Sequence, residues 1–175
     1  MKTLADTGSL PGLAELIAER RRRGLDGHDE VWAGVYHVAA MARADHGDIQ
    51  AQLLVTLAGL AAPLGLVVSG PVNIGLSEND HRVPDGVVLR DRTDQVWVHT
   101  AAMVVEVRSP GDETYEKFDF YYTRGVEEIL VADPAGRDLR LFGRGSAEYE
   151  RIDASVLLGV PVTHIAQAIV WPHSR

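Results

Sequence analysis

Helical spacing of apolar residues predicts three helices in this chain. Residues that recur every three or four positions form one apolar stripe, which is the signature of a helix packed against a core. Over 46–63 the stripe consists of Ile49, Leu53, Thr56, Leu57 and Leu60. Similar spacing over 10–23, followed by Gly24, predicts a second helix, and we expect a third over 113–124 that stops at Gly125.

Other segments are rich in strand-forming residues and lack helical spacing. The segment 101–107, AAMVVEV, is almost continuously apolar, as is typical of a strand buried on both faces. Similar arguments predict a strand or hairpin over 30–41 and strands over 65–76 (kinked at Gly70-Pro71), 83–90, 127–134 and 137–143. The tail over 155–171 is apolar but fits either a strand or a helix.

The order of these elements indicates an α/β fold. Strand, helix and strand over 101–133 form a crossover unit, which joins two parallel strands. The early strands follow one another closely, so we expect them to be antiparallel. The pattern therefore predicts a mixed central sheet flanked by helices.

Composition narrows the class of protein further. With 175 residues we expect a single domain with a real core, and a net charge of −8 argues against indiscriminate coating of nucleic acid. The chain has no cysteine, which excludes disulfides and thiolate metal sites and fits a cytoplasmic protein. No apolar run is long enough to span a bilayer, so we expect no membrane association.

Three charged residues stand where they could form a phosphodiester-hydrolysing site. Asp85 opens a strand, Glu106 lies inside the next strand, and Lys117 follows in the helix. Two carboxylates on neighbouring strands can share a hard divalent cation such as Mg²⁺. A nearby lysine can position or deprotonate a metal-bound water and neutralise developing phosphate charge. Because Lys117 lies on a helix turn, we expect it to contribute little to the core.

The ordered motifs resemble the PD-(D/E)xK nuclease superfamily, and within it the Uma-type restriction-endonuclease family. The matching residues are Pro84-Asp85, Glu106-Val107-Arg108-Ser109-Pro110, Lys117, Tyr121, Gly125-Val126 and Asp133-Pro134. The resemblance covers about residues 28–142, including a histidine, His46, at the start of a helix. It leaves residues 1–27 as an N-terminal helical extension and 143–175 as a C-terminal segment of a single nuclease-like domain.

The resemblance implies a restriction-endonuclease-like fold and a nuclease that acts on DNA. It implies that Asp85 and Glu106 hold Mg²⁺ or Mn²⁺ and that Lys117 is the catalytic cation. His46, Arg108, Glu113 and Tyr121 are expected to support these residues. The superfamily's usual lysine stands two residues after the glutamate, where this chain has Arg108. Two residues along a strand return to the same face, so Arg108 is expected to clamp phosphate.

Each candidate residue also has a purely structural interpretation. Asp85 fits a Pro-Asp-Gly turn, Glu106 could pair with Arg108, and Lys117 could pair with Glu113 one helical turn earlier. Asp112 fits a helix N-cap, and His46 a cap or a surface residue. The basic run Arg20–Arg23 is either a set of cations favoured at a helix C-terminus or a phosphate-contacting patch.

The sequence leaves two main functions open. The first is a metal-dependent DNA endonuclease, and cutting both strands with one site per chain would favour a homodimer. The second is a catalytically silent relative that uses the same fold to bind nucleic acid or a protein partner. A phosphatase that uses the same carboxylates is a more distant third.

Overall fold

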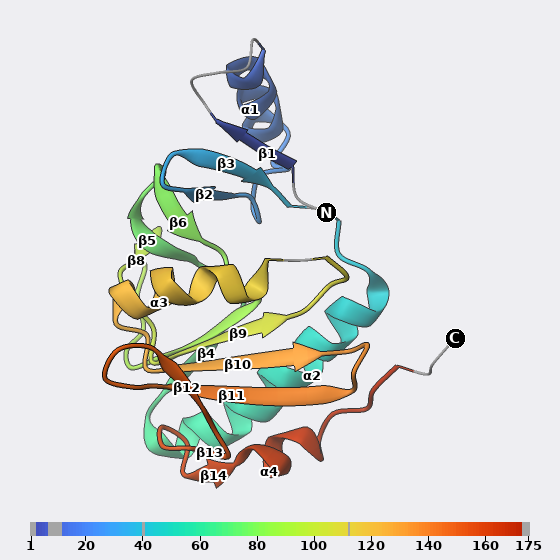
Figure 1. Ribbon diagram of the computed structural model, residues 1–175, viewed down its shortest axis with the longest axis vertical. Coiled ribbons are helices and arrows are strands. Elements are labelled where there is room, and N and C mark those ends of the chain that lie inside the picture. Colours follow the sequence, from blue (N-terminus) through green and yellow to red (C-terminus); the bar gives the residue numbers. More distant parts are fainter. Residues whose placement is uncertain (1–2, 7–11, 40, 112, 173–175) are drawn as a thin grey trace.

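The computed structural model describes residues 3–6, 12–39, 41–111 and 113–172. Two six-stranded sheets lie one beyond the other along the long axis, with helix α3 between them (Figure 1). In chain order the elements are β1 (Thr3–Asp6), α1 (Leu13–Arg22), β2 (Glu30–Trp32), β3 (Val35–Val38), α2 (Ala44–Ala61), the 3₁₀ turn η1 (Ala62–Leu64), β4 (Val67–Ser69), β5 (Asn73–Ser77), β6 (Asp80–Arg82), β7 (Gly86–Leu89), β8 (Trp97–Val98), β9 (Met103–Val107), the 3₁₀ turn η2 (Thr114–Lys117), α3 (Phe118–Arg124), β10 (Glu128–Asp133), β11 (Asp138–Arg144), β12 (Tyr149–Ile152), β13 (Ala154–Ser155), β14 (Val160–Pro161) and α4 (Val162–Ala166).

The central sheet is mixed, as the sequence predicts. Its strand order is β12-β11-β10-β9-β7-β4. Strands β9 and β10 are parallel and are joined by the predicted crossover through η2 and α3, whereas the other neighbouring pairs are antiparallel. The predicted α/β fold with a mixed central sheet is therefore confirmed.

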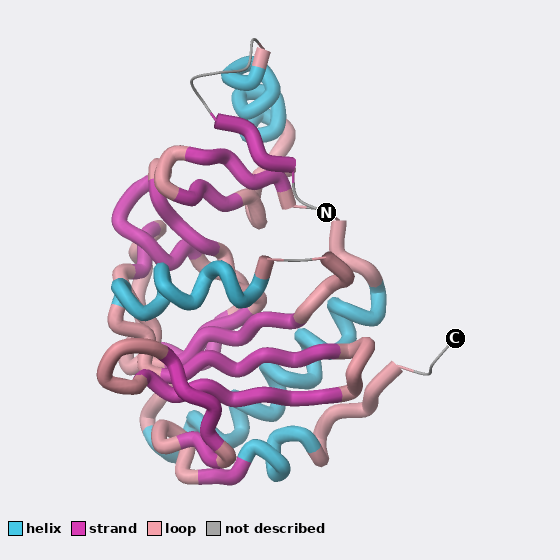
Figure 2. Tube along the Cα trace, in the orientation of Figure 1, coloured by secondary structure: helices cyan, strands magenta, loops and turns pink. Residues whose placement is uncertain are grey.

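Helices cover both faces of this sheet (Figure 2). Helices α2 and α4 pack on one face, where Met103, Val105 and Val107 of β9 join their core. Helix α3 packs on the other face, together with Val104. Because side chains alternate along a strand, Glu106 points toward the α3 face, away from the larger apolar core.

The second sheet was not predicted as a separate sheet. Its strand order is β1-β3-β2-β6-β5-β8, and its early strands are antiparallel as expected. The strand predicted over 65–76 is in fact two strands, β4 and β5, which belong to different sheets. The chain changes sheet at Gly70-Pro71, because proline removes a ladder donor and ends the pairing of β4.

Several predicted boundaries also differ from the structure, and the structure resolves the ambiguity of the tail. The helix over 10–23 spans Leu13–Arg22. The helix over 113–124 begins as the 3₁₀ turn η2 and becomes α-helical only at Phe118. The ambiguous tail contains β14 and the short helix α4, whose Ile165 is fully buried in the core.

The described part of the chain contains no helix long and apolar enough to cross a bilayer. The longest, α2, is amphipathic and buries Ile49, Leu53, Leu57 and Ala61 against the central sheet.

The packing of α2 provides a test of the core. Leu53 is fully buried, whereas Val55 on the same helix is 74% exposed. Leu53→Ala should reduce the free energy of unfolding by about 2–5 kcal/mol, because it removes buried methyl groups and leaves a cavity. Val55→Ala should change it by no more than about 0.5 kcal/mol. Urea unfolding followed by circular dichroism measures both, and equal losses would contradict this packing.

Candidate active site

An ammonium group lies between two buried carboxylates at the junction of the two sheets. Lys117 Nζ is 2.9 Å from Glu106 Oε1, 3.1 Å from Glu106 Oε2 and 2.9 Å from Glu30 Oε1. The three residues are only 1–5% exposed, so water screens these contacts little. Lys117, and not Arg108, is therefore the ion-pair partner of Glu106.

Each of these side chains comes from a different element. Glu106 belongs to β9 of the central sheet and Glu30 to β2 of the second sheet. Lys117 ends the 3₁₀ turn that leads into α3, the helix between the sheets (Figure 1). Tyr121 lies one helical turn further, and its hydroxyl donates a 2.6 Å hydrogen bond to Glu106 Oε1.

Burial and neighbouring charges set the protonation of this cluster. Burial raises the pKa of Glu106 to about 7; Lys117 opposes this shift, and the negative charges of Asp85 and Glu30 add to it. Burial by itself would lower the pKa of Lys117, but Glu106 and Glu30 together raise it above its ordinary value. The two carboxylates therefore favour the ammonium form of Lys117.

Asp85 lies beside Glu106 and is held by specific contacts. Gly86 is in register with Val105, which places Asp85 opposite Glu106 just before β7 begins. Its Oδ2 accepts a 2.7 Å hydrogen bond from the Val107 amide, and its backbone oxygen accepts one of 2.7 Å from Gln50 Nε2. Asp85 does more than form a turn, because these contacts tie it to β9 and α2.

His46 also belongs to this site. Its Nε2 lies 2.9 Å from Asp85 Oδ1, and its Nδ1 lies 3.3 Å from the Ser109 hydroxyl. The side chains of His46 and Asp85 are 14% and 18% exposed, more than those of Glu106 and Lys117. The cluster is therefore most accessible to solvent on its Asp85 side.

The remaining two predicted residues lie near the cluster but have other partners. Arg108 Nη1 is 2.8 Å from Asp133 Oδ2, and Glu113 Oε2 is 3.4 Å from His37 Nδ1. The ion pairs of Glu106 with Arg108 and of Lys117 with Glu113 are thus not the ones formed. Asp112, the possible N-cap, lies outside the described residues.

Glu30 belongs to the cluster but was not predicted as a site residue from the sequence. It accepts hydrogen bonds from the Val83 amide (3.0 Å) and from Trp32 Nε1 (2.7 Å), in addition to its contact with Lys117. The available signal was the same as for Glu106: a carboxylate inside a segment rich in strand-forming residues. Nothing in the spacing indicated that this strand would face α3 from a second sheet.

The oxygen atoms of Asp85 and Glu106 suit a hard cation. Each carboxylate has about four lone-pair positions, and the contacts above leave some of them unused. Among the described residues, no group of three or more His, Cys, Asp or Glu side chains is arranged to hold a metal ion. A cation here would thus rest on two carboxylates and several waters, which is a common arrangement for Mg²⁺.

The arginines of the predicted basic run, Arg20–Arg23, form ion pairs with acidic residues outside the candidate site. Arg20 binds Asp29 in two contacts of 2.6 and 2.8 Å, Arg21 is 3.0 Å from Glu78, and Arg22 and Arg23 both pair with Glu19. These ion pairs lie on and around α1, beside the second sheet. They favour the structural interpretation of the run over a phosphate-contacting patch at this site.

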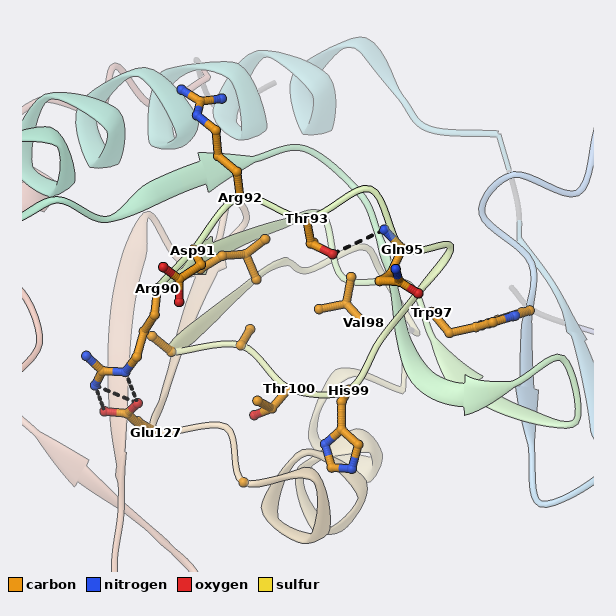
Figure 3. Close-up of a pocket in the computed structure, with 14 residues that line it drawn as sticks. Arg90, Asp91, Arg92, Thr93, Gln95, Trp97, Val98, His99, Thr100 and Glu127 are labelled. Atoms are coloured by element: carbon orange, nitrogen blue, oxygen red, sulfur yellow. Dashed lines mark hydrogen bonds and ion pairs between the residues drawn. The ribbon is translucent and has the colours of Figure 1, made fainter.

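A cavity of about 360 Å³ lies at the far end of the central sheet from Asp85 and Glu106. Arg90 and Glu127, which form a bidentate ion pair, line it together with His99 and Thr100 (Figure 3). Arg90 follows the last residue of β7, whereas Asp85 precedes its first. This cavity is therefore separate from the candidate site.

Loss of Lys117 should destabilise the fold, contrary to the expectation that it contributes little. Lys117→Met leaves two buried carboxylates without their cation, which should cost about 3–5 kcal/mol of unfolding free energy. Arg21→Met removes a cation from an exposed ion pair and should cost no more than about 1 kcal/mol. Urea unfolding compares the two variants. A loss for Lys117→Met no larger than that for Arg21→Met would show that the buried pairs are not needed.

Known proteins share the fold and the sequence pattern of this chain. A crystal structure described as a putative nuclease belonging to DUF820 from Anabaena variabilis ATCC 29413 matches with a TM-score of 0.64 and 15% identity, covering 80% of this chain and 90% of that one. That likeness establishes a shared fold. Among curated proteins there is no match. The family model Uma2, described as "Putative restriction endonuclease", matches residues 19–165. The chain belongs to the Uma2 family.

Proposed function

We propose that this protein is a metal-dependent endonuclease that hydrolyses phosphodiester bonds of DNA. The observation that carries the proposal is the convergence of Asp85, Glu106 and Lys117 from separate elements. Membership of the Uma2 family, whose description is "Putative restriction endonuclease", supports it. The function predicted from the sequence stands as the best account of the site.

Asp85 and Glu106 would hold Mg²⁺ or Mn²⁺ on the accessible side of the cluster. When bound, such a cation polarises a phosphoryl oxygen and lowers the pKa of a bound water. Lys117 remains an ammonium ion between Glu106 and Glu30. Its contribution is positive charge near the developing negative charge on phosphate, in a poorly solvated setting where that charge is effective.

The neighbouring residues hold the two carboxylates in place. Tyr121 donates a hydrogen bond to Glu106, and burial, with Glu106 nearby, raises the pKa of Tyr121 well above its ordinary value, so the phenol keeps its proton. His46 and the Val107 amide each hold one oxygen of Asp85. Such contacts with metal ligands orient them and tune their basicity.

One site per chain would cut one strand at a time. A homodimer would place two sites on the two strands of a DNA duplex, and we propose this assembly for double-strand cleavage. We further propose that the protein acts in the cytoplasm, which its lack of cysteine fits.

One observation favours the alternative of a catalytically silent nuclease fold that binds nucleic acid or a protein partner. Lys117 and Glu106 are 5% and 4% exposed, and Lys117 is already neutralised by two carboxylates. Such a cluster could serve stability alone. Metal binding and cleavage distinguish the two functions.

The cleavage test uses substitutions that keep side-chain size. Supercoiled and linear DNA are incubated with Mg²⁺ or Mn²⁺, and Asp85→Asn and Glu106→Gln should each reduce cleavage about 100-fold or more, since both remove charge that holds the cation. Glu127→Gln, at the far end of the sheet, should cleave as the wild type does. If the wild type cleaves no nucleic acid and Mn²⁺ leaves its melting temperature unchanged, the silent alternative holds.

A second test concerns His46. Removing a residue that orients a metal ligand typically weakens metal binding about 10–100-fold, so His46→Ala should weaken Mn²⁺ binding to this extent. His99→Ala serves as the control, because His99 lines the distant cavity. Isothermal titration with Mn²⁺ measures both affinities. Equal affinities for the two variants would show that His46 does not support the site.

A further inference from the structure

Two arginines meet at an exposed tyrosine beside the candidate site. Tyr115 is 39% exposed and lies in the turn that leads to Lys117. The guanidinium of Arg108 lies 5.3 Å from the centre of its ring, and Arg140 Nη1 donates a 2.8 Å hydrogen bond to its hydroxyl. We refer to Arg108, Tyr115 and Arg140 as the arginine–tyrosine cluster.

Strand register places this cluster in line with the carboxylates. Glu106 of β9 is in register with Val131 of β10, which is in register with Arg140 of β11. Residues in register share a face, so Arg140 and Glu106 both lie on the α3 face. Two strand spacings separate their backbones by about 10 Å, or roughly three nucleotides of axial rise along DNA.

Arg108 continues the same face beyond the end of β9. Its amide donates a 2.8 Å hydrogen bond to the Ala132 carbonyl, which extends the pairing of β9 with β10 past Val107. Two residues after Glu106, its side chain returns to the α3 face. Arg140 thus ends the row that leads from Glu106 across the sheet, and Arg108 lies on the same face, two residues beyond the start of that row.

Acidic residues orient both guanidinium groups. Asp133 Oδ2 is 2.8 Å from Arg108 Nη1, and Asp138 Oδ2 is 2.6 Å from Arg140 Nε. The arginine side chains are 30% and 31% exposed, so part of each remains accessible to a ligand. A guanidinium has five N–H donors in a rigid fork, which lets it bind a carboxylate and a phosphate together.

We propose that the arginine–tyrosine cluster binds the phosphodiester backbone of the DNA strand, to one side of the bond that is cut. This proposal rests on the proposed nuclease function and adds the path of the substrate, from Asp85 and Glu106 toward β11. The partner is a polyanion because the cluster presents two oriented guanidinium groups, which match phosphate in charge and geometry. Each guanidinium is paired with one aspartate, so the cluster offers phosphate oriented N–H donors rather than a surplus of positive charge.

The test measures binding without cleavage. Fluorescein-labelled DNA, single-stranded or duplex, is titrated in EDTA with wild-type protein and with Arg140→Gln, over a range of salt concentrations. Losing one phosphate contact should reduce the slope of log K against log [salt] by about 0.9 for duplex and about 0.7 for single strands. At about 0.1 M salt, the duplex value corresponds to binding weakened roughly 8-fold.

Arg90→Gln is the matched control. Arg90 is also an exposed arginine paired with a carboxylate, that of Glu127, but it lies at the opposite end of the sheet. The Arg90→Gln substitution removes the same charge as Arg140→Gln. If DNA binds at the cluster, Arg90→Gln should leave the salt slope unchanged, because Arg90 lies away from the bound strand. Tyr115→Phe removes the hydroxyl that holds Arg140 and should give a smaller loss of affinity in the same direction as Arg140→Gln.

The outcomes separate this proposal from the nuclease function. Equal effects of Arg140→Gln and Arg90→Gln, or a wild type that does not bind DNA, would overturn the cluster as a binding surface. Metal-dependent cleavage with an unchanged slope for Arg140→Gln would overturn the cluster and keep the nuclease. If the slope of log K against log [salt] is reduced in Arg140→Gln but not in Arg90→Gln, and the wild type cleaves no DNA, the cluster is supported as a DNA-binding surface and the nuclease function is refuted. Unchanged melting temperatures for Arg140→Gln and Tyr115→Phe ensure that folding does not explain the result.

Discussion

The ion pairs of one ammonium group join the two sheets of this protein. Lys117 contacts Glu106 of the central sheet and Glu30 of the second sheet, and all three side chains are nearly inaccessible to water. Taking such charges out of water is costly unless each finds close partners. The hydrogen bonds of Tyr121, Trp32 and the Val83 amide to the two carboxylates supply further partners. The relative placement of the sheets is therefore tied to the integrity of this cluster.

The same contacts determine what Lys117 can do chemically. Two carboxylates raise its pKa, which favours the charged ammonium form. The chain has 17 lysines and arginines, of which Lys2 and Lys117 are the only lysines. A compact ammonium fits between two carboxylates at 2.9 Å, whereas the broad planar guanidinium demands a wider site. This difference in shape is consistent with lysine rather than arginine at this position.

The central sheet could be predicted from local pattern, whereas most residues of the site were identified through the resemblance to a nuclease family. The apolar run around Glu106 and the crossover to β10 follow from alternation and connection rules, whereas the register of Asp85 beside Glu106 is seen only in the structure. Glu30 and the second sheet could not be predicted, because they depend on which strands pair across long stretches of sequence. A single Gly-Pro step moves the chain from one sheet to the other, and an isolated sequence does not distinguish that step from a kink.

Strand alternation explains how a buried core and a polar site occupy the same strand. Odd-numbered residues of β9, from Met103 to Val107, pack against α2 in the larger core. Even-numbered positions face α3, where Val104 is apolar and Glu106 and Arg108 are charged. This face becomes polar toward the end of β9, beside the 3₁₀ turn that precedes α3. The Asp85 side of the site is the more exposed to water. A shift of one residue in the pairing of β9 would turn Glu106 toward the α2 core and Val107 toward the α3 face, so the register that stabilises the core also assembles the site.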